Sequence, residues 1–291
     1  MSNLSKIPII KMIAQQALDD HFNNIEKHTK ADVITISGPL IPPLEPLVLR
    51  GLDDKTKRND KICVIIETYG GIIHTVEKMV RLIRRLYEHV SFIIPNEAMS
   101  AGTVFVLSGD EILMNYHSYL GPVDPQVYDS DQQELVPALS YLSQFEILNE
   151  KARNEEITAA ELVLIDNIDP GKLHQYGQEK ELTVELIVDW LCKYKFKNWD
   201  YTESTNEEVS ENKKRIVAQE IASKLSDNEL WHSHSRGIDL ETITDKVQLK
   251  VTDYSDESEL YDEIKHYMSI VQEYKLMTKQ YCFVQTKEYK L

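Results

Sequence analysis

Apolar positions along the chain fall into two kinds of pattern. Residues 31–37 and 62–66 are short runs rich in valine and isoleucine, which are typical of buried strands. Between residues 72 and 89, apolar side chains recur every three or four positions, and this spacing predicts an amphipathic helix. The next apolar run, 91–95, predicts another strand. The order strand, helix, strand predicts an α/β fold with a mainly parallel sheet.

The rest of the chain shows weaker patterns. The prolines at 42, 43 and 46 are expected to keep the stretch that follows them irregular. Residues 200–214 have almost no apolar side chain and are expected to form a mobile polar loop. Helices are also expected over residues 5–28, 101–107, 136–153, 158–166, 183–194 and 261–274, a short strand over 111–115, a charged loop over 53–60 and a proline-rich turn over 119–126.

Length and composition suit one large domain with two flanking segments. The chain has 291 residues, of which 42% are hydrophobic, so it can bury a sizeable core. We expect a helical extension over residues 1–30, the main domain over 31–255 and a helical tail over 256–291.

Two glycine-bearing segments follow the predicted strands and carry the candidate chemistry. Gly70 and Gly71 come after the second strand, and Ser100 comes after the third. Parallel strands place both loops at the same carboxyl edge of the sheet. A serine hydroxyl there would be the nucleophile, and the backbone amides of Gly71, Gly70 and Ala101 would form an oxyanion hole. The alternative is that Ser100 only caps the helix that follows it.

Three motifs together give the chain a family resemblance. They are Tyr69-Gly70-Gly71, the segment 98–103 (Ala-Met-Ser-Ala-Gly-Thr) and the segment 117–126, which contains Leu-Gly-Pro-Val-Asp-Pro-Gln. This set resembles the serine dehydrogenase proteinase family, within the Clp peptidase and signal peptide peptidase A superfamily of crotonase-like folds. The resemblance covers residues 30–255 and implies repeated β-β-α units, a mainly parallel sheet flanked by helices, and a serine peptidase activity.

The resemblance also implies a general base. In Clp-type peptidases a histidine follows the strand after the nucleophile helix, and His117 occupies that place here. Its alternative role is a turn histidine bonded to the bend at residues 121–122. The third member of the implied triad falls near His234, where an imidazole would orient the base, and Asp239 could replace it.

Signal peptide peptidase relatives instead use a lysine whose pKa is lowered by burial. Lys151 and Lys172 are the candidates by position, and ordinary surface lysines are the alternative reading of both. His232 and His234 share the spacing of a metal pair, but no third ligand stands at a suitable distance in the sequence. We therefore expect no metal and no cofactor, and only a turn-capping role for Asp124.

The charge balance limits the classes of partner. With 48 acidic and 32 basic residues the net charge is −16, which disfavours nucleic acid or an anionic membrane surface as the main partner. A basic cluster on the predicted 72–89 helix is expected to be a solvated face or an oligomer contact; it consists of Lys78, Arg81, Arg84 and Arg85.

The chain has neither an apolar stretch long enough to span a bilayer nor the apolar core of a signal peptide near its start. Its three cysteines, Cys63, Cys192 and Cys282, are far apart and are expected to be free thiols. These features predict a cytoplasmic protein without membrane insertion, and the resemblance implies a homo-oligomer.

Three functions are consistent with these observations. The first is a serine peptidase acting on extended polypeptides that pair beside the strand of Gly70 and Gly71. The second is a crotonase-like enzyme acting on an acyl-coenzyme A thioester, which needs the two amides but no serine. The third is a catalytically silent oligomeric module. The presence of Ser100 at the loop favours the first.

Overall fold

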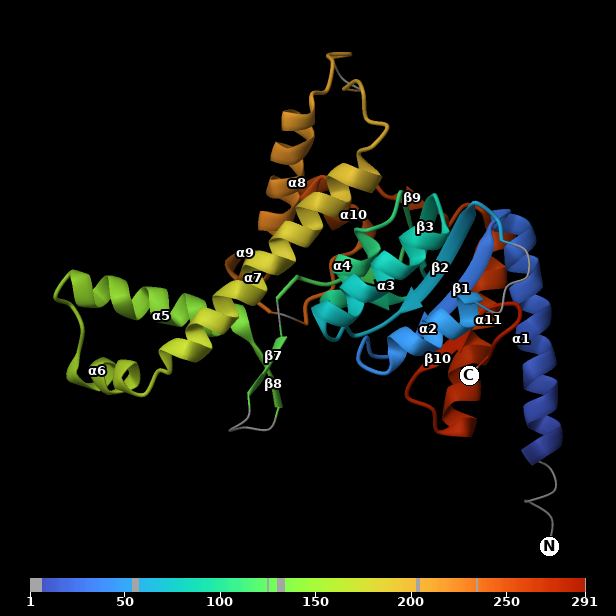
Figure 1. The fold of residues 1–291 in the computed structure, drawn as a ribbon, viewed down its shortest axis with the longest axis horizontal. Helices are drawn as coiled ribbons and strands as arrows, with labels where there is room; N and C mark the ends of the chain where they lie inside the picture. The colour runs from blue at the N-terminus through green and yellow to red at the C-terminus, as the bar shows by residue number, and fades with distance from the viewer. Residues whose placement is uncertain are drawn as a thin grey trace, which may run out of the picture.

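A six-stranded sheet organises the molecule (Figure 1). The computed structural model describes residues 7–53, 58–124, 126–129, 134–202, 205–233 and 235–290. The strand order is β10-β1-β2-β3-β5-β9, and every neighbouring pair is parallel except β10 with β1. The strands are β1 (Asp32–Ser37), β2 (Lys61–Glu67), β3 (His89–Ile94), β5 (Glu111–Met114), β9 (Thr252–Asp253) and β10 (Phe283–Gln285). The predicted α/β class with a mainly parallel sheet is therefore confirmed.

One face of the sheet packs against the crossover helices. These are α2 (Leu44–Asp53), α3 (Ile73–Leu86) and α4 (Ala101–Val106). Alternate side chains of β2, such as Val64 and Ile66, pack against this layer together with Val76 and Met79 of α3. The apolar spacing seen in the sequence thus marks the buried side of α3, as an amphipathic helix requires.

The other face is covered by the two ends of the chain. Helix α1 (Ile7–Thr29) lies antiparallel beside α11 (Ser258–Thr278), and both pack on the sheet (Figure 1). Leu18, Phe22, Ile264 and Tyr267 are buried there together with Cys63 of β2. The segments predicted as a flanking extension and a helical tail therefore share the core of the sheet. The tail also contributes β10, a strand that the sequence analysis did not predict.

The remaining helices extend outward from the side of α3 and α4. A helical arm is formed by α5 and α6, next to the first turns of α7, and α8 rises on another side (Figure 1). The bounds are α5 (Ala138–Arg153), α6 (Ala159–Asp166), α7 (Pro170–Trp190), η1 (Leu191–Lys195), α8 (Glu211–Leu225), α9 (Asn228–Trp231), α10 (Leu240–Thr242) and η2 (Ile243–Val247). Two small ribbons complete the structure: β4 (Glu97–Ala98) with β6 (Tyr119–Leu120), and β7 (Gln126–Asp129) with β8 (Glu134–Pro137).

Two predictions about irregular segments were wrong in part. Helix α2 begins at Leu44, directly after Pro42 and Pro43, and includes Pro46, although these prolines were expected to prevent a helix here. Pro46 lies in the first turn, where a backbone N–H has no partner within the helix, so proline costs little there. The predicted polar loop 200–214 ends early, because α8 begins at Glu211 and is capped by the Ser210 hydroxyl. Lys214, in the first turn of α8, is buried.

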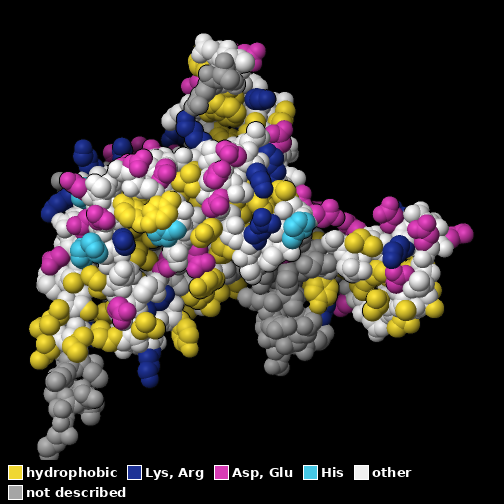
Figure 2. Space-filling view, turned by 180° about the vertical axis from the view of Figure 1, so that it is seen from behind, with side chains coloured by type: hydrophobic (Ala, Val, Ile, Leu, Met, Phe, Trp, Pro, Cys, Tyr) yellow, Lys and Arg dark blue, Asp and Glu magenta, His cyan; other side chains and the backbone are white. Residues whose placement is uncertain are grey.

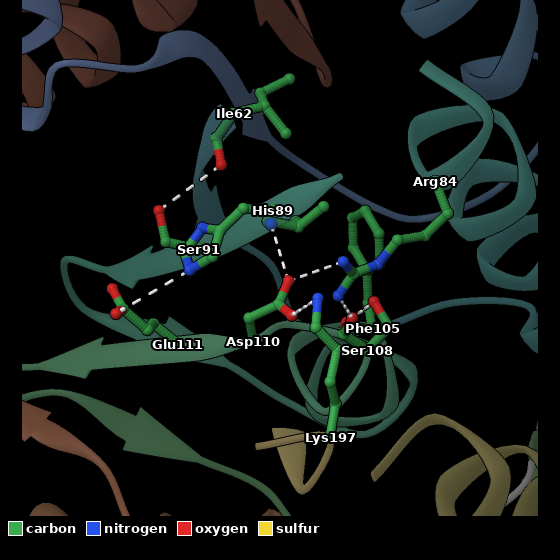
Figure 3. A network of polar contacts seen from close by, with 10 residues as sticks. Ile62, Arg84, His89, Ser91, Phe105, Ser108, Asp110, Glu111 and Lys197 are labelled. Carbon is green, nitrogen blue, oxygen red and sulfur yellow. Dashed lines mark hydrogen bonds and ion pairs between the residues drawn. The ribbon is translucent and has the colours of Figure 1, made fainter. Parts of the chain in front are cut away.

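A polar network ties the amino edge of the sheet to α3 (Figure 3). The guanidinium of Arg84 is 2.6 Å from the carboxylate of Asp110, donates to the carbonyl of Ser108 and lies 3.6 Å from the ring centre of Tyr194. Asp110 also accepts the backbone N–H of Val90 at 2.8 Å. Burial lowers the pKa of Arg84, and Asp110 opposes that shift. Arg84 therefore belongs to the buried framework and not to a solvated basic face.

Within the described ranges, no helix is both long enough and apolar enough to cross a bilayer. The three cysteines carry free thiols, as predicted, and Cys63 is buried in the core beneath α1 and α11. Burial raises the pKa of the Cys63 thiol to about 12, so this side chain is inert.

Candidate active site

The loop between β2 and α3 lies beside the loop that carries Ser100. The backbone of Thr68 donates to the carbonyl of Glu97 at 2.9 Å and accepts the N–H of Met99 at 2.9 Å. These two bonds extend the parallel pairing of β2 and β3 into the loops that follow them. The expectation that both loops meet at the carboxyl edge of the sheet is confirmed by this pairing.

Ser100 has a backbone conformation that is rare for a residue with a side chain. Its φ is 52° and its ψ is −118°, at the point where β4 turns into α4. Although it stands at the helix N-cap, its side chain makes no capping hydrogen bond, and it is 4% exposed. A non-glycine residue in such a region is strained, and strain of this kind gathers at functional sites. The capping interpretation of Ser100 is therefore wrong.

Gly70 and Gly121 flank Ser100 and approach it closely. A Cβ atom built on Gly70 would lie 2.9 Å from the Cβ of Ser100 and 2.9 Å from the carbonyl oxygen of Met99. One built on Gly121 would lie 3.0 Å from the backbone nitrogen of Ser100. Gly70 also has a φ of 110°, which side-chain-bearing residues rarely adopt. The motif segments around residues 70, 100 and 121 thus form one site.

The amides around Ser100 differ in what they bind. The N–H of Gly70 donates to the Thr68 hydroxyl at 3.0 Å, so it is already engaged. The neighbouring backbone pairs with Leu40, which donates to the carbonyl of Gly70 and accepts from Ile72, each at 2.9 Å. Among the described residues, the N–H groups of Gly71 and Ala101 donate to no protein acceptor. Gly71 and Ala101 therefore each offer a backbone donor at this edge.

Thr103 holds the segments of the site together, although the sequence analysis gave it no role. Its buried hydroxyl contacts the carbonyls of Ala98 and Gly121 at 2.8 and 2.9 Å and accepts the N–H of Gly121 at 2.9 Å. Thr68 plays a similar part in the other loop. The sequence gives only a slight signal for these roles: Thr68 stands two positions before Gly70, and Thr103 stands three positions after Ser100.

His117 lies on the other side of the sheet edge from α4. Its backbone N–H is held by the Asn115 side chain at 2.9 Å, and its ring packs against Tyr116 and Tyr261, with ring centres 4.8 and 6.4 Å away. The ring forms no hydrogen bond with Ser100 or with the bend at residues 121–122 in the described part of the chain. The turn-histidine alternative is therefore not observed among the described residues.

A cavity of about 210 Å³ adjoins His117 beneath α11. Glu67 lies on its wall, where its carboxylate accepts hydrogen bonds from Ser37, Asn96 and Gln272. Because Glu67 ends β2 three residues before Gly70, this cavity and the Ser100 loop occupy the same edge of the sheet. The edge therefore presents polar groups on both faces.

The other candidate residues lie elsewhere or outside the described ranges. Lys151, on the arm, forms an ion pair of 2.6 Å with Glu161, and its ammonium is one of the groups that lower the pKa of that carboxyl to about 2. Lys172 is in the first turn of α7, beside the arm. Asp239 caps α10 through Thr242, and those hydrogen bonds lower its pKa. His234 lies outside the described residues. No hydrogen bond or ion pair joins Lys151 or Asp239 to Ser100.

A family model for ClpP-like SDH-type serine proteinases matches residues 46–202, just over half of the chain. The chain belongs to this family. The matched range of this SDH-type proteinase contains Gly70, Ser100, His117 and both candidate lysines, but neither His234 nor Asp239. The resemblance predicted from the motifs is confirmed.

Two uncharacterized proteins of Methanocaldococcus jannaschii are similar to this SDH-type proteinase in sequence. One is 32% identical over 134 residues, which make up 46% of this chain and 41% of that protein. The other is 27% identical over 132 residues, which make up 45% of this chain and 46% of that protein. The chain thus spans less than half the length of each.

Solved structures similar to this chain include two variants of the 1510-N membrane-bound stomatin-specific protease, one of them in complex with a substrate peptide. Both have a TM-score of 0.45 and 13% sequence identity. They cover 79% of this chain and 82% and 78% of their own.

No group of three or more metal-ligating side chains that could hold an ion occurs in the part of the chain that the structure describes. The site consists of a serine with a strained backbone, the amides of Gly71 and Ala101, and a buried threonine that joins the segments of Ala98 and Gly121. Such an arrangement suits nucleophilic attack on a carbonyl carbon, with the amides receiving the negative charge that develops on its oxygen.

Proposed function

We propose that this protein is a serine peptidase that hydrolyses extended polypeptides through Ser100. The observation that carries the proposal is the strained, uncapped backbone of Ser100 beside the amides of Gly71 and Ala101. The hydroxyl oxygen attacks the scissile carbonyl, the bond to the leaving amine breaks, and water then releases the acyl group from Ser100. The family membership supports this class of reaction.

The oxyanion hole in this proposal consists of two amides. The N–H groups of Gly71 and Ala101 donate to the oxyanion, and Ala101 also opens α4, whose dipole favours negative charge. Gly70 has a different part from the one expected, since its own N–H is engaged by Thr68. It contributes by having no side chain at a place where Ser100 leaves no room.

We propose His117 as the general base and His234 as the group that orients it. Support for His117 comes from its position in the turn after β5, at the same edge of the sheet as Ser100; its ring, which packs against Tyr116 and Tyr261, would have to turn toward the serine. Catalytic hydrogen bonds are often formed only when substrate is bound. Lys151 and Lys172 are the alternative general bases. Lys151 would have to reach Ser100 from α5, and Lys172 from the first turn of α7.

The proposed substrate is a polypeptide in extended conformation, which would pair with the backbone near Gly71. The acidic net charge supports a protein that does not act on nucleic acid. We also propose a cytoplasmic location, which the three free thiols support, and a homo-oligomer, which light scattering would test against the monomer mass of 33.7 kDa.

Labelling with a fluorophosphonate probe tests the proposal. Ser100→Ala should abolish labelling and peptide hydrolysis without unfolding the protein, because loss of one hydroxyl leaves almost no cavity. Ser108→Ala is the matched control: it lies just beyond the other end of α4, is 2% exposed and should keep full labelling. A wild-type protein that neither labels nor hydrolyses peptides would favour the acyl-coenzyme A enzyme or the silent module.

A further inference from the structure

The free end of α1 carries large apolar side chains that no other part of the described chain covers. Ile9, Ile10, Met12 and Ile13 are 57%, 52%, 63% and 62% exposed. Farther along the same helix, Leu18 and Phe22 are buried against α11 and the sheet. The apolar side chains of the helix therefore change from buried to more than half exposed within about two turns, where it runs past the sheet (Figure 1).

The end of α11 adds to this surface. Leu276 and Tyr281 are 74% and 89% exposed, and the antiparallel contact of α11 with α1 brings them to the same end of the molecule. Figure 2 shows hydrophobic side chains gathered at this end of the molecule. We call this surface, made of residues 9–13 and 276–281, the apolar tip. Monomers rarely expose so many large apolar side chains in one place without a binding role.

The charge of the tip is opposite to that of the whole molecule. Residues 9–13 and 276–281 contain Lys11 and Lys279 and no acidic side chain, whereas the chain carries 16 more acidic than basic residues. Lys11 lies 5.9 Å from the ring centre of Tyr274, so its ammonium stays at the surface between the two helices. At physiological salt the Debye length is about 8 Å, so acidic residues that lie farther than this from the tip hardly weaken the local field of the lysines.

We propose that the apolar tip docks on the surface of a lipid bilayer that carries anionic headgroups. Isoleucine and methionine side chains at the end of α1 would enter the boundary between headgroups and acyl chains, and the lysines would meet the lipid phosphates. Tyr281 supplies an aromatic ring of the kind that settles at this boundary. The contact is peripheral, in keeping with the absence of a bilayer-spanning helix in the described ranges.

The same charges argue against a second copy of the chain as the occupant. A two-fold contact between tips would bring Lys11 and Lys279 of both copies together, without an acidic side chain on either tip to compensate them. An anionic lipid surface offers the complementary charge and an apolar layer at once. It would also place the peptidase on one side of the membrane without any segment crossing it.

Sedimentation with lipid vesicles tests this inference on the full-length protein. Wild type should sediment with phosphatidylcholine vesicles that contain phosphatidylserine, and less with pure phosphatidylcholine. Ile13→Glu should weaken binding at least about tenfold, because it places a charge in the apolar layer. Val163→Glu is the matched control, since Val163 on α6 is 61% exposed, and it should bind as wild type does.

A double variant of the tip lysines and a single control variant test the role of charge in vesicle binding. Lys11→Gln with Lys279→Gln should reduce binding to phosphatidylserine vesicles and remove most of its salt dependence, whereas Lys27→Gln, at the other end of α1, should not. Failure of wild type to bind anionic vesicles overturns the inference. So does a wild-type oligomer that Ile13→Glu dissociates without any vesicle binding, because the occupant would then be a second copy. Neither result bears on labelling of Ser100.

Discussion

The backbone of Gly70 lies so close to Ser100 that a Cβ atom on residue 70 would be 2.9 Å from the Cβ of the serine. Real Cβ atoms do not come so near to each other, so any side chain at residue 70 must push the serine loop away. The serine is itself held at a φ of 52°. The two loops therefore fit together only because one of them has no side chain at the point of contact.

Gly70→Ala should thus disturb both stability and reactivity. We expect a loss of about 1–3 kcal/mol in the free energy of unfolding, from the positive φ and the contact with Ser100, and little remaining probe labelling. Urea denaturation and labelling measure the two effects. Gly177→Ala is the control, because nothing lies within 4 Å of its Cβ position and it sits inside α7, where alanine should stabilise by about 1 kcal/mol. Equal effects at both positions would contradict the account of Gly70.

Thr103→Val should separate the effect of the Thr103 hydrogen bonds from the effect of its side-chain volume. Valine keeps the volume of threonine but leaves the N–H of Gly121 without its acceptor, which costs about 1–3 kcal/mol. The labelling rate of Ser100 should fall as the loop loosens. Thr103→Ser keeps the hydroxyl and should restore labelling, although it loses a buried methyl group. If Thr103→Ser labels as slowly as Thr103→Val, the methyl group of Thr103, and not its hydrogen bonds, sets the labelling rate of Ser100.

The identity of the base can be read from mutants and from pH. His117→Ala should lower the labelling rate about a hundredfold, the usual scale for loss of a positioned proton acceptor. If a histidine is the base, the wild-type rate should rise between about pH 6 and pH 7, where imidazole side chains lose their proton. His234→Ala should have the smaller effect, since an orienting group takes no proton. A near-normal His117→Ala beside an inactive Lys151→Ala or Lys172→Ala would assign the role to a lysine.

The ion pair at the amino edge should matter for folding and not for chemistry. Asp110→Asn leaves the 7%-exposed guanidinium of Arg84 without its charged partner and should destabilise the protein by about 3–5 kcal/mol. Arg81→Gln breaks an exposed pair with Glu77, 2.6 Å apart, and should cost at most about 0.5 kcal/mol. Urea midpoints compare the two. Similar midpoints would mean that Arg84 is as well hydrated as Arg81.

The sequence predicted the structure well where the pattern within one helix or strand determines it. The β-branched run of β2 and the spacing of α3 follow from burial on one face, and Ser100 could be located from its motif. Contacts between distant segments were harder to foresee. Pairing of β10 with β1 depends on residues about 250 positions apart, and the engagement of Gly70 by Thr68 depends on a loop conformation. The ring of His117 packs on Tyr261, far along the chain, so its direction could not follow from local spacing.

The pairing of β10 with β1 has a consequence for biosynthesis. Thr35 is made about 250 residues before its partner Gln285, so a growing chain leaves the outer edge of β1 open while those residues are synthesised. An open, apolar strand edge is a template for pairing with other chains. Strand β10 therefore covers this edge, and a ribosome that stops shortly before residue 283 would release a chain with the edge of β1 uncovered.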